Sequence, residues 1–547
     1  MINRRFLAVS FWGCCAIMAY SQQIGEVKLE EKVYNIPSYQ QNPPNVMPRF
    51  YEGKSHQGVQ RRIYPYPFDD GLTANKRDME HPMIHIENDY IDLAISTELG
   101  GRIYYADDKT NQYNYLYHNH VVKPSLIGMQ GNWISGSLAW GYPHHHGSNT
   151  VEKMAYQIEE KEDGSKTVWI RSWDRLHRME VVIGYTVYPG SSIIEMTIHP
   201  KNRTAISNSF LFWANPAVHC DSAYQVIFPP SVKYVTFHGK NQMTSWPIAD
   251  SWFNGYDFAG MDISYWKNTH VPSSFFSWNP QEDYFCGYDH NKEAGTAWIG
   301  NHYICPGMKY WADGNNPNGL KTNEGLTDVD GRYIELMAGF YTDNQPDYSW
   351  LQPYETKIGK MVWFPIRELG GLKYANRKGA LNYFIKGDLL DLRLNSTELV
   401  KDAEVIVVAS GKDIYRKKVT ISPAIPQKIE CSLPEGIGEL DLKMSLCNSQ
   451  GRVLLEYEPA AYMTVDEKRP EPLKPFAKPK EMKSVEELYL AGLRLEQFYN
   501  ASVDPMPYYE EALREVLTLV REDRVGRAAS EPVMTPVVRQ GSHARTG

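Results

Sequence analysis

The residue with the clearest chemical potential is Glu335, in the stretch 332–339, whose apolar and β-branched content predicts a β-strand. Alternate residues of a strand share one face, so Tyr333, Glu335 and Met337 would lie together. In a lined cleft, the loss of water around the Glu335 carboxyl would raise its pKa toward the range that suits general acid/base chemistry. On an exposed face the same carboxyl would be an ordinary surface charge, as most Glu side chains are.

Arg102 follows the paired glycines Gly100 and Gly101 between two predicted strands. The glycines permit a tight turn and a close approach of the chain. The guanidinium group of Arg102 then has the fork of donors that grips hydroxyl groups or a carboxylate. A simple hairpin is the alternative interpretation.

Three adjacent histidines, His144, His145 and His146, lie in a glycine- and aromatic-rich segment that also contains Trp140. Neighbouring side chains of an extended segment point to opposite sides, so at most two of them could hold one ligand. No Asp or Glu is adjacent to them. Three interpretations remain open: hydrogen bonds to a polar substrate, a metal site and a solvated loop.

Three further positions have side chains suited to a site. His219 ends the bulky segment 212–218, and its imidazole could transfer protons near neutral pH, although a histidine at a strand end can also be structural. Trp311 offers a flat face for stacking, and Asp257 is an acid within an aromatic loop. The sequence contains no G-x-S-x-G elbow, phosphate-binding loop or H-E-x-x-H motif. We therefore expect no nucleotide cofactor and no serine-based hydrolysis, and we assign no metal or other cofactor.

The composition is that of a folded protein in which aromatic side chains are unusually common. Of the 547 residues, 42% are hydrophobic and 22% charged, and the net charge of −8 offers no electrostatic basis for a nucleic-acid partner. Aromatic residues make up 13% of the chain, with 37 Tyr and 14 Trp. Some of these rings must form cores. Because sugars also stack their C–H faces on such rings, the content favours a carbohydrate ligand.

The chain is too long for one hydrophobic core. Short apolar or alternating runs separated by Gly, Pro, Asn and Asp predict a mainly β protein. The predicted parts are a signal peptide over 1–21, a large antiparallel β-sandwich over 28–366, an immunoglobulin-like β-sandwich over 380–465, a proline-rich linker over 466–483, a helical fragment over 484–520 and a disordered tail over 521–547.

The N-terminal residues have the pattern of an export signal. A charged start at 3–5 precedes the apolar run 6–19, and small residues flank a cut that would leave Gln22 as the first mature residue. We expect a periplasmic or cell-surface location. Cys14 and Cys15 leave lipoprotein processing open as an alternative. No apolar stretch beyond the signal is long enough for a membrane span.

The helical fragment has the spacing of a helix pair. Ser484 precedes the first helix as its cap, and Gly492 and Ala512 are the small positions where two helices could approach. This pattern resembles the opening of a tetratricopeptide repeat, of which about three are needed to bury the apolar faces. These helices could contact a protein partner. The segment 521–547 lacks a hydrophobic period, so we hypothesise that a longer repeat array has been lost.

Several motifs together resemble the galactose mutarotase-like superfamily. In chain order they are the segment 99–103, an early His in a glycine-rich aromatic loop, the segment 215–219 and a late strand with Glu335. Residues 80–365 are more closely similar to the domain of unknown function 5107 family of Bacteroidetes, whose members are often followed by tetratricopeptide repeats. The resemblance implies a large mutarotase-like β-sandwich.

The resemblance also implies roles for individual residues. In mutarotases a late-strand Glu is the general base, a mid-chain His is the general acid and a second His assists. By position, Glu335 would be the base, His219 the acid and one of the three adjacent histidines, taken as His145, the helper. The sequence departs from the family pattern because Leu336 and Met337, instead of Thr-Gln, follow the Glu.

From these residues we expect an exported carbohydrate-active protein that cleaves or remodels a glycosidic linkage, with Glu335 acting on the leaving oxygen. An aldose 1-epimerase and a non-catalytic glycan-binding module are the alternatives. The second carboxylate for hydrolysis would be Asp257, Asp221 or Glu355. The predicted substrate-binding side chains are Arg102, Trp140, His144, His146, Asp257 and Trp311.

Overall fold

The structure is a computed structural model that describes residues 25–45, 63–128, 130–144, 146–147, 150–343, 347–459, 468–497 and 503–530, with side chains to residue 523. The predicted signal peptide and His145 lie outside the described residues.

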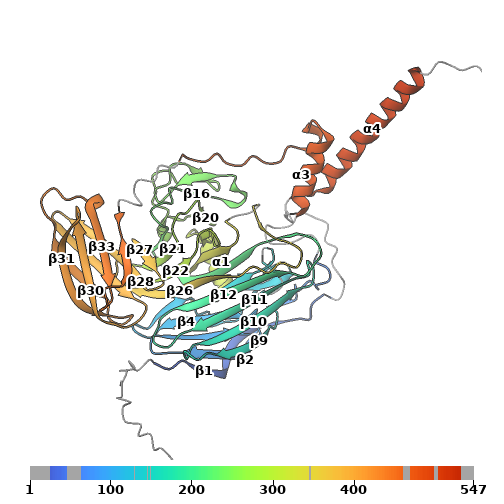
Figure 1. Cartoon of the computed structure of the whole chain (residues 1–547). Helices are drawn as coiled ribbons and strands as arrows, with labels where there is room; N and C mark the ends of the chain where they lie inside the picture. Colours follow the sequence, from blue (N-terminus) through green and yellow to red (C-terminus); the bar gives the residue numbers. More distant parts are fainter. Residues whose placement is uncertain are drawn as a thin grey trace, which may run out of the picture.

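Two large antiparallel sheets form the first domain (Figure 1). The first is a 12-stranded sheet in which β5 (Tyr113–Leu116) pairs with β4 and the other strands follow in spatial order. They are β1 (Lys28–Gln41), β2 (Leu72–Glu87), β3 (Ile91–Ser96), β4 (Arg102–Asp108), β8 (Leu138–Gly141), β14 (Phe212–His219), β24 (Tyr333–Phe340), β23 (Gly307–Ala312), β20 (Ser273–Ser277), β16 (Tyr234–Thr236) and β17 (Met243–Ser245).

The second is an 8-stranded sheet that packs on the first. Its strands are, in spatial order, β15 (Tyr224–Ile227), β21 (Tyr284–Asp289), β22 (Ala294–Gly300), β26 (Gly359–Arg367), β12 (Ile194–Asn202), β11 (Met179–Val187), β10 (Lys166–Asp174) and β9 (Ala155–Glu160). One buried cluster joins residues of both sheets, including Ile183 and Ile198 of one and Ile334 and Leu336 of the other. This packing confirms the predicted β-sandwich.

Small elements surround the large sheets. Three two-stranded sheets are β6 (Pro124–Gly128) with β7 (Gly131–Ile134), β13 (Asn208–Phe210) with β25 (Ser349–Leu351), and β18 (Trp252–Phe253) with β19 (Tyr256–Asp257). Two 3₁₀ turns are η2 (His238–Lys240) and η3 (Trp266–Asn268). One helix of this domain, α1 (Pro317–Thr327), was not expected from the sequence.

A second, smaller sandwich follows. Its sheets are β27 (Tyr374–Asn376), β28 (Gly379–Lys386), β29 (Leu389–Ser396) and β32 (Gln427–Ser432), and β31 (Lys412–Ile421), β30 (Val400–Ala409), β33 (Leu442–Cys447) and β34 (Val453–Tyr457), with the 3₁₀ turn η4 (Glu439–Asp441). It begins at Tyr374, before the expected start at residue 380. Its first strands pack on the 8-stranded sheet, where Tyr284 and Phe364 join Ala375 and Ala380 in a buried cluster.

The C-terminal elements are η5 (Pro479–Glu481), α3 (Val485–Gln497) and α4 (Met506–Ser530), and Figure 1 shows them on the side away from the second sandwich. Ser484 caps α3 as expected, accepting a hydrogen bond from the Glu487 backbone at 3.1 Å. The tail was expected to be disordered from residue 521, but α4 continues to Ser530. The Arg, Glu and Ala residues after position 520 are strong helix formers, which explains this difference.

The linker to α3 runs along the first domain. The Arg469 guanidinium pairs with Asp250 at 2.6 Å, and the Leu473 amide donates to the Lys240 carbonyl at 2.7 Å. Arg494 of α3 pairs with Asp347 at 3.1 Å. Among the described residues, no helix has the length and apolar character needed to cross a bilayer.

Candidate functional site

A cavity of about 360 Å³ lies on the 12-stranded sheet, on the face that points away from the core between the two sheets. Its floor is formed by the central strands β8, β14, β24, β23 and β20. Aromatic rings and polar side chains share the lining. This combination is typical of a small-molecule site.

Strand alternation explains which residues of β24 line the cavity. Tyr333, Glu335 and Met337 all face it, as the sequence predicted, whereas Ile334 and Leu336 enter the core. Only 6% of the Glu335 surface is exposed. The interpretation of Glu335 as a surface charge is therefore wrong.

The neighbouring strand β23 repeats this pattern. Trp311 is paired directly with Glu335, and Lys309 is paired with Met337. Both residues line the cavity, and Asp313 follows just beyond the end of the strand. This part of the cavity floor thus carries the Trp311 indole, the Lys309 ammonium group and two carboxyl groups side by side.

On the other side of Glu335, strand β14 contributes Trp213 and Asn215. Asn215 lies beside the Glu335 carboxyl as a hydrogen-bond partner. Phe276 of β20 closes the floor beyond β23.

Helix α1 forms part of the wall opposite the floor, through Thr322 and Leu326. Asn316 caps this helix, accepting a hydrogen bond from the Gly319 amide at 2.8 Å, and Pro317 occupies its first turn. A Cβ atom at Gly319 would lie 2.3 Å from the Asp313 carbonyl oxygen, so only glycine allows the first turn to approach β23 so closely.

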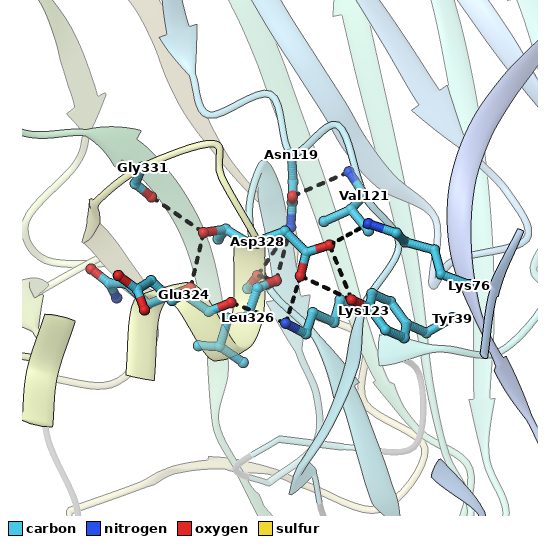
Figure 2. A network of polar contacts seen from close by, with 12 residues as sticks. Tyr39, Lys76, Asn119, Val121, Lys123, Glu324, Leu326, Asp328 and Gly331 are labelled. Carbon is cyan, nitrogen blue, oxygen red and sulfur yellow. Dashed lines mark hydrogen bonds and ion pairs between the residues drawn. The ribbon is translucent and has the colours of Figure 1, made fainter. Parts of the chain in front are cut away.

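A network of polar contacts fixes the other end of α1 (Figure 2). Asp328 follows the helix and accepts from Lys123 at 2.6 Å, from Lys76 at 2.9 Å and from the Tyr39 hydroxyl at 3.1 Å. Tyr39 and Lys76 belong to β1 and β2, so the network ties the cavity wall to the sheet edge. Leu326, which lines the cavity, receives hydrogen bonds at its carbonyl oxygen from Asn119 and Ser135.

The environment of Glu335 favours its neutral form. Burial raises the pKa of Glu335 from 4.5 to about 7, although the nearby Lys309 charge and the Asn215 hydrogen bond oppose the shift. Burial also lowers the pKa of Lys309, to about 8, and here the Glu335 charge opposes the shift. A carboxyl with a pKa near neutrality can both donate and accept a proton at physiological pH.

Asp313 is the second acid of the cavity. Burial raises its pKa from 3.8 to about 6, against a hydrogen bond from the Asn323 amide of α1 at 2.7 Å. Its charge in turn contributes to the raised pKa of Glu335. The cavity thus contains two carboxyl groups whose pKa values are both raised by burial.

Two histidines also line the cavity. His238 of η2 lies 2.8 Å from the Ser274 hydroxyl through Nε2. His146 packs edge-on against Trp133 of β7, with ring centroids 5.9 Å apart. Either imidazole could exchange a proton with a ligand in the cavity.

His219, the predicted general acid, does not line the cavity. It is on the same face of the sheet as Glu335, but it pairs with Tyr333, one step farther along the strands, and its ring packs on Tyr117 at 4.0 Å between centroids. Burial and the positive charges of Lys292 and two histidines lower its pKa to about 4. A neutral imidazole outside the cavity does not support the predicted role.

Arg102 is structural, in contrast to its predicted contact with substrate. Its guanidinium group is buried and donates to the backbone carbonyls of Leu99, Ile134 and Thr150 at 2.9, 2.7 and 2.7 Å. The paired glycines therefore belong to the turn between β3 and β4, and Arg102 links this hairpin to the backbone at Ile134 and Thr150. Thr150 lines the cavity, so Arg102 supports the site from behind.

The other predicted residues divide between the cavity and the rest of the domain. Trp311 and His146 line it, and Trp140 borders it while its ring stacks on Phe212 in the core. His144 is buried beside His177, with centroids 4.6 Å apart, and does not line the cavity.

None of the expected second carboxylates lines the cavity. Asp257 is exposed and accepts from the Ala259 amide, Asp221 accepts from Asn291, and Glu355 accepts from the Gln352 amide. The carboxyl group that lines the cavity together with Glu335 is that of Asp313. The described residues contain no group of three or more His, Cys, Asp or Glu side chains that could hold a metal ion.

The fold and cavity define a class: two-layer antiparallel β-sandwich proteins with an acid-bearing, ring-lined cavity on the outer face of one sheet. Within this class the chain belongs to the family described as a domain of unknown function (DUF5107), whose model matches residues 59–366. This match confirms the family expected from the sequence. Residues 374–457 match the second domain of a YphG-like protein, which covers the small sandwich.

Solved structures of similar fold include a TPR-domain containing protein from Parabacteroides distasonis, at 19% identity and a TM-score of 0.55, covering 64% of this chain and 58% of that one. The chain thus spans 58% of the length of that protein. A galactose mutarotase-like protein from Clostridium acetobutylicum is 11% identical, with a TM-score of 0.36 and coverage of 53% and 96%. A galactose mutarotase related enzyme from Lactobacillus acidophilus is 11% identical, with a TM-score of 0.37 and coverage of 52% and 97%.

Proposed function

We propose that the chain binds a carbohydrate in this cavity and cleaves or remodels a glycosidic linkage there. The observation that carries the proposal is the buried Glu335 carboxyl, which shares a ring-lined cavity with Asp313. Trp311, directly paired with Glu335, offers a stacking face to a sugar ring beside the acid.

The two acids divide the work of hydrolysis by their environments. Glu335, whose pKa is raised to about 7, is the better proton donor to the leaving oxygen. Asp313, whose pKa is raised to about 6, ionises first as the pH rises and would act as base or nucleophile.

Aldose 1-epimerase chemistry is a second candidate, because His238 and His146 line the same cavity as Glu335. One acid and one base near the anomeric carbon suffice for that reaction. It would not require Asp313, so the two candidates differ in their dependence on this residue.

The test is a panel of oligosaccharides and free aldoses, assayed for cleavage and for anomer exchange. Glu335→Gln should lower the rate by about 10²- to 10⁴-fold in either case, whereas Asp313→Asn should do so only for cleavage. Glu162→Gln, at an exposed turn, is the matched control. Turnover that Glu335→Gln leaves unchanged would remove the catalytic assignment, and binding without turnover would favour a glycan-binding module.

We also propose that the protein is exported, on the strength of its charged and apolar N-terminal pattern, with lipid attachment at Cys14 or Cys15 as the alternative. N-terminal sequencing of the mature protein would distinguish a start at Gln22 from a lipid-modified Cys. An uncleaved Met1 would contradict both. The C-terminal helices are the proposed contact for a protein partner.

A further inference from the structure

The ammonium group of Lys309 is buried in the cavity without a hydrogen-bond acceptor among the described residues. Only 6% of the Lys309 surface is exposed. Its Nζ atom lies 4.9 Å from the centroid of the Phe276 ring and 5.8 Å from that of Trp311. The Glu335 charge raises the pKa of Lys309, but the carboxyl and ammonium groups lie more than 4.0 Å apart and form no ion pair.

Such a position is costly for a cation. Removing an ammonium group from water is strongly unfavourable unless acceptors replace the lost hydration. Contacts with the faces of Phe276 and Trp311 recover only part of this cost. Three N–H donors therefore remain available to whatever enters the cavity.

The other charges of the cavity favour an anionic group at this place. Burial raises the pKa of Glu335 to about 7, so at neutral pH this carboxyl offers Lys309 only part of a negative charge, and Asp313 is not among the charges that shift the pKa of Lys309. His238 and His146 also line the cavity. A ligand with one negative charge would complete the charge balance at Lys309.

We propose that the sugar bound here is acidic, a hexuronate unit whose carboxylate pairs with Lys309 while its ring stacks on Trp311. This inference rests on the proposed carbohydrate function. The carboxylate accepts from the ammonium group, and the apolar face of the ring covers the indole. A negative charge beside Glu335 also stabilises the protonated carboxyl, so binding should be accompanied by proton uptake.

The test compares uronate oligosaccharides with their methyl esters, which are neutral and nearly the same shape, by titration calorimetry on the full chain. Wild type should bind the acid at least tenfold more tightly than the ester. Lys309→Met should abolish this preference by weakening the acid alone, and Lys309→Arg should retain it. Lys321→Met, at an exposed position of α1, should change neither affinity.

The outcomes separate this inference from the function on which it rests. Equal binding of acid and ester by wild type, or a preference that survives Lys309→Met, would overturn the acidic-sugar assignment and leave the carbohydrate function standing. Binding of neither acidic nor neutral sugars would overturn both. The wild-type comparison needs no variant, so it holds even where a substitution impairs folding. Titrations in buffers of different ionisation enthalpy should show net proton uptake for the acid and none for the ester.

Discussion

Trp311 and Glu335 face each other as a direct pair across β23 and β24, with both side chains in the cavity. Side chains of such a pair have Cβ atoms about 5 Å apart. A sugar ring stacked on the indole therefore brings its oxygens to the carboxyl. The pairing of β23 with β24 thus places a flat surface for stacking directly beside an acid.

The first prediction concerns stability and pH. The pKa of Glu335 is raised in the folded state from 4.5 to about 7, so the folded protein holds this proton more tightly than the unfolded chain. Its contribution to stability is full below about pH 4.5 and is lost as the pH rises to about 7, by an amount on the order of 1–3 kcal/mol. Relative to Glu335→Gln, wild type should lose melting temperature between pH 5 and pH 7, as scanning calorimetry would show. Parallel curves for the two proteins would exclude the raised pKa.

The second prediction concerns the anchor of α1. Asp328→Asn removes the charge that accepts from Lys76, Lys123 and Tyr39, and should cost about 1–3 kcal/mol. Although partial burial opposes it, hydrogen bonding from Lys123 and Lys76 keeps the pKa of Asp328 below its usual 3.8. The stabilisation is thus present at neutral pH and is lost in acid below that value.

Hydrogen exchange provides the measurement for this anchor. The amides of α1 should exchange faster in Asp328→Asn, and ligand affinity should fall because α1 forms a cavity wall. Glu324→Gln on the same helix is the control, since its side chain is exposed. Unchanged exchange in α1 would show that the network does not hold the wall.

The third prediction concerns the helix pair at the C-terminus. A Cβ atom at Gly492 would lie 2.8 Å from the Tyr509 ring, so Gly492→Leu should push α3 and α4 apart at a cost of about 1–3 kcal/mol. Faster exchange in both helices with unchanged cavity affinity is the expected result. Leu490→Ala, at an exposed position of α3, is the control. Tight packing retained in Gly492→Leu would contradict the close approach.

Strand periodicity made much of the cavity floor predictable. The alternation that places Tyr333, Glu335 and Met337 on one face also places Lys309 and Trp311 on one face, so Lys309 could have been found from the same rule. Helix α1 also carries a start signal in its sequence, the cap residue Asn316 followed by Pro317.

Other parts of the site depend on tertiary packing. His219 has the correct strand and face, but the position of Tyr117 on its ring could not be read from local sequence. Arg102 looked available for a ligand because two of its backbone acceptors, at Ile134 and Thr150, come from segments distant in sequence. Asp313 is part of the cavity because α1 folds back over it through Gly319.

The most direct test of the central claim is a crystal structure of the Glu335→Gln variant with a bound oligosaccharide from the panel. The account predicts one sugar ring stacked on Trp311, with its glycosidic oxygen within hydrogen-bond distance of the side chain at position 335. Sugar density on another surface, with the cavity filled only by water, would contradict it.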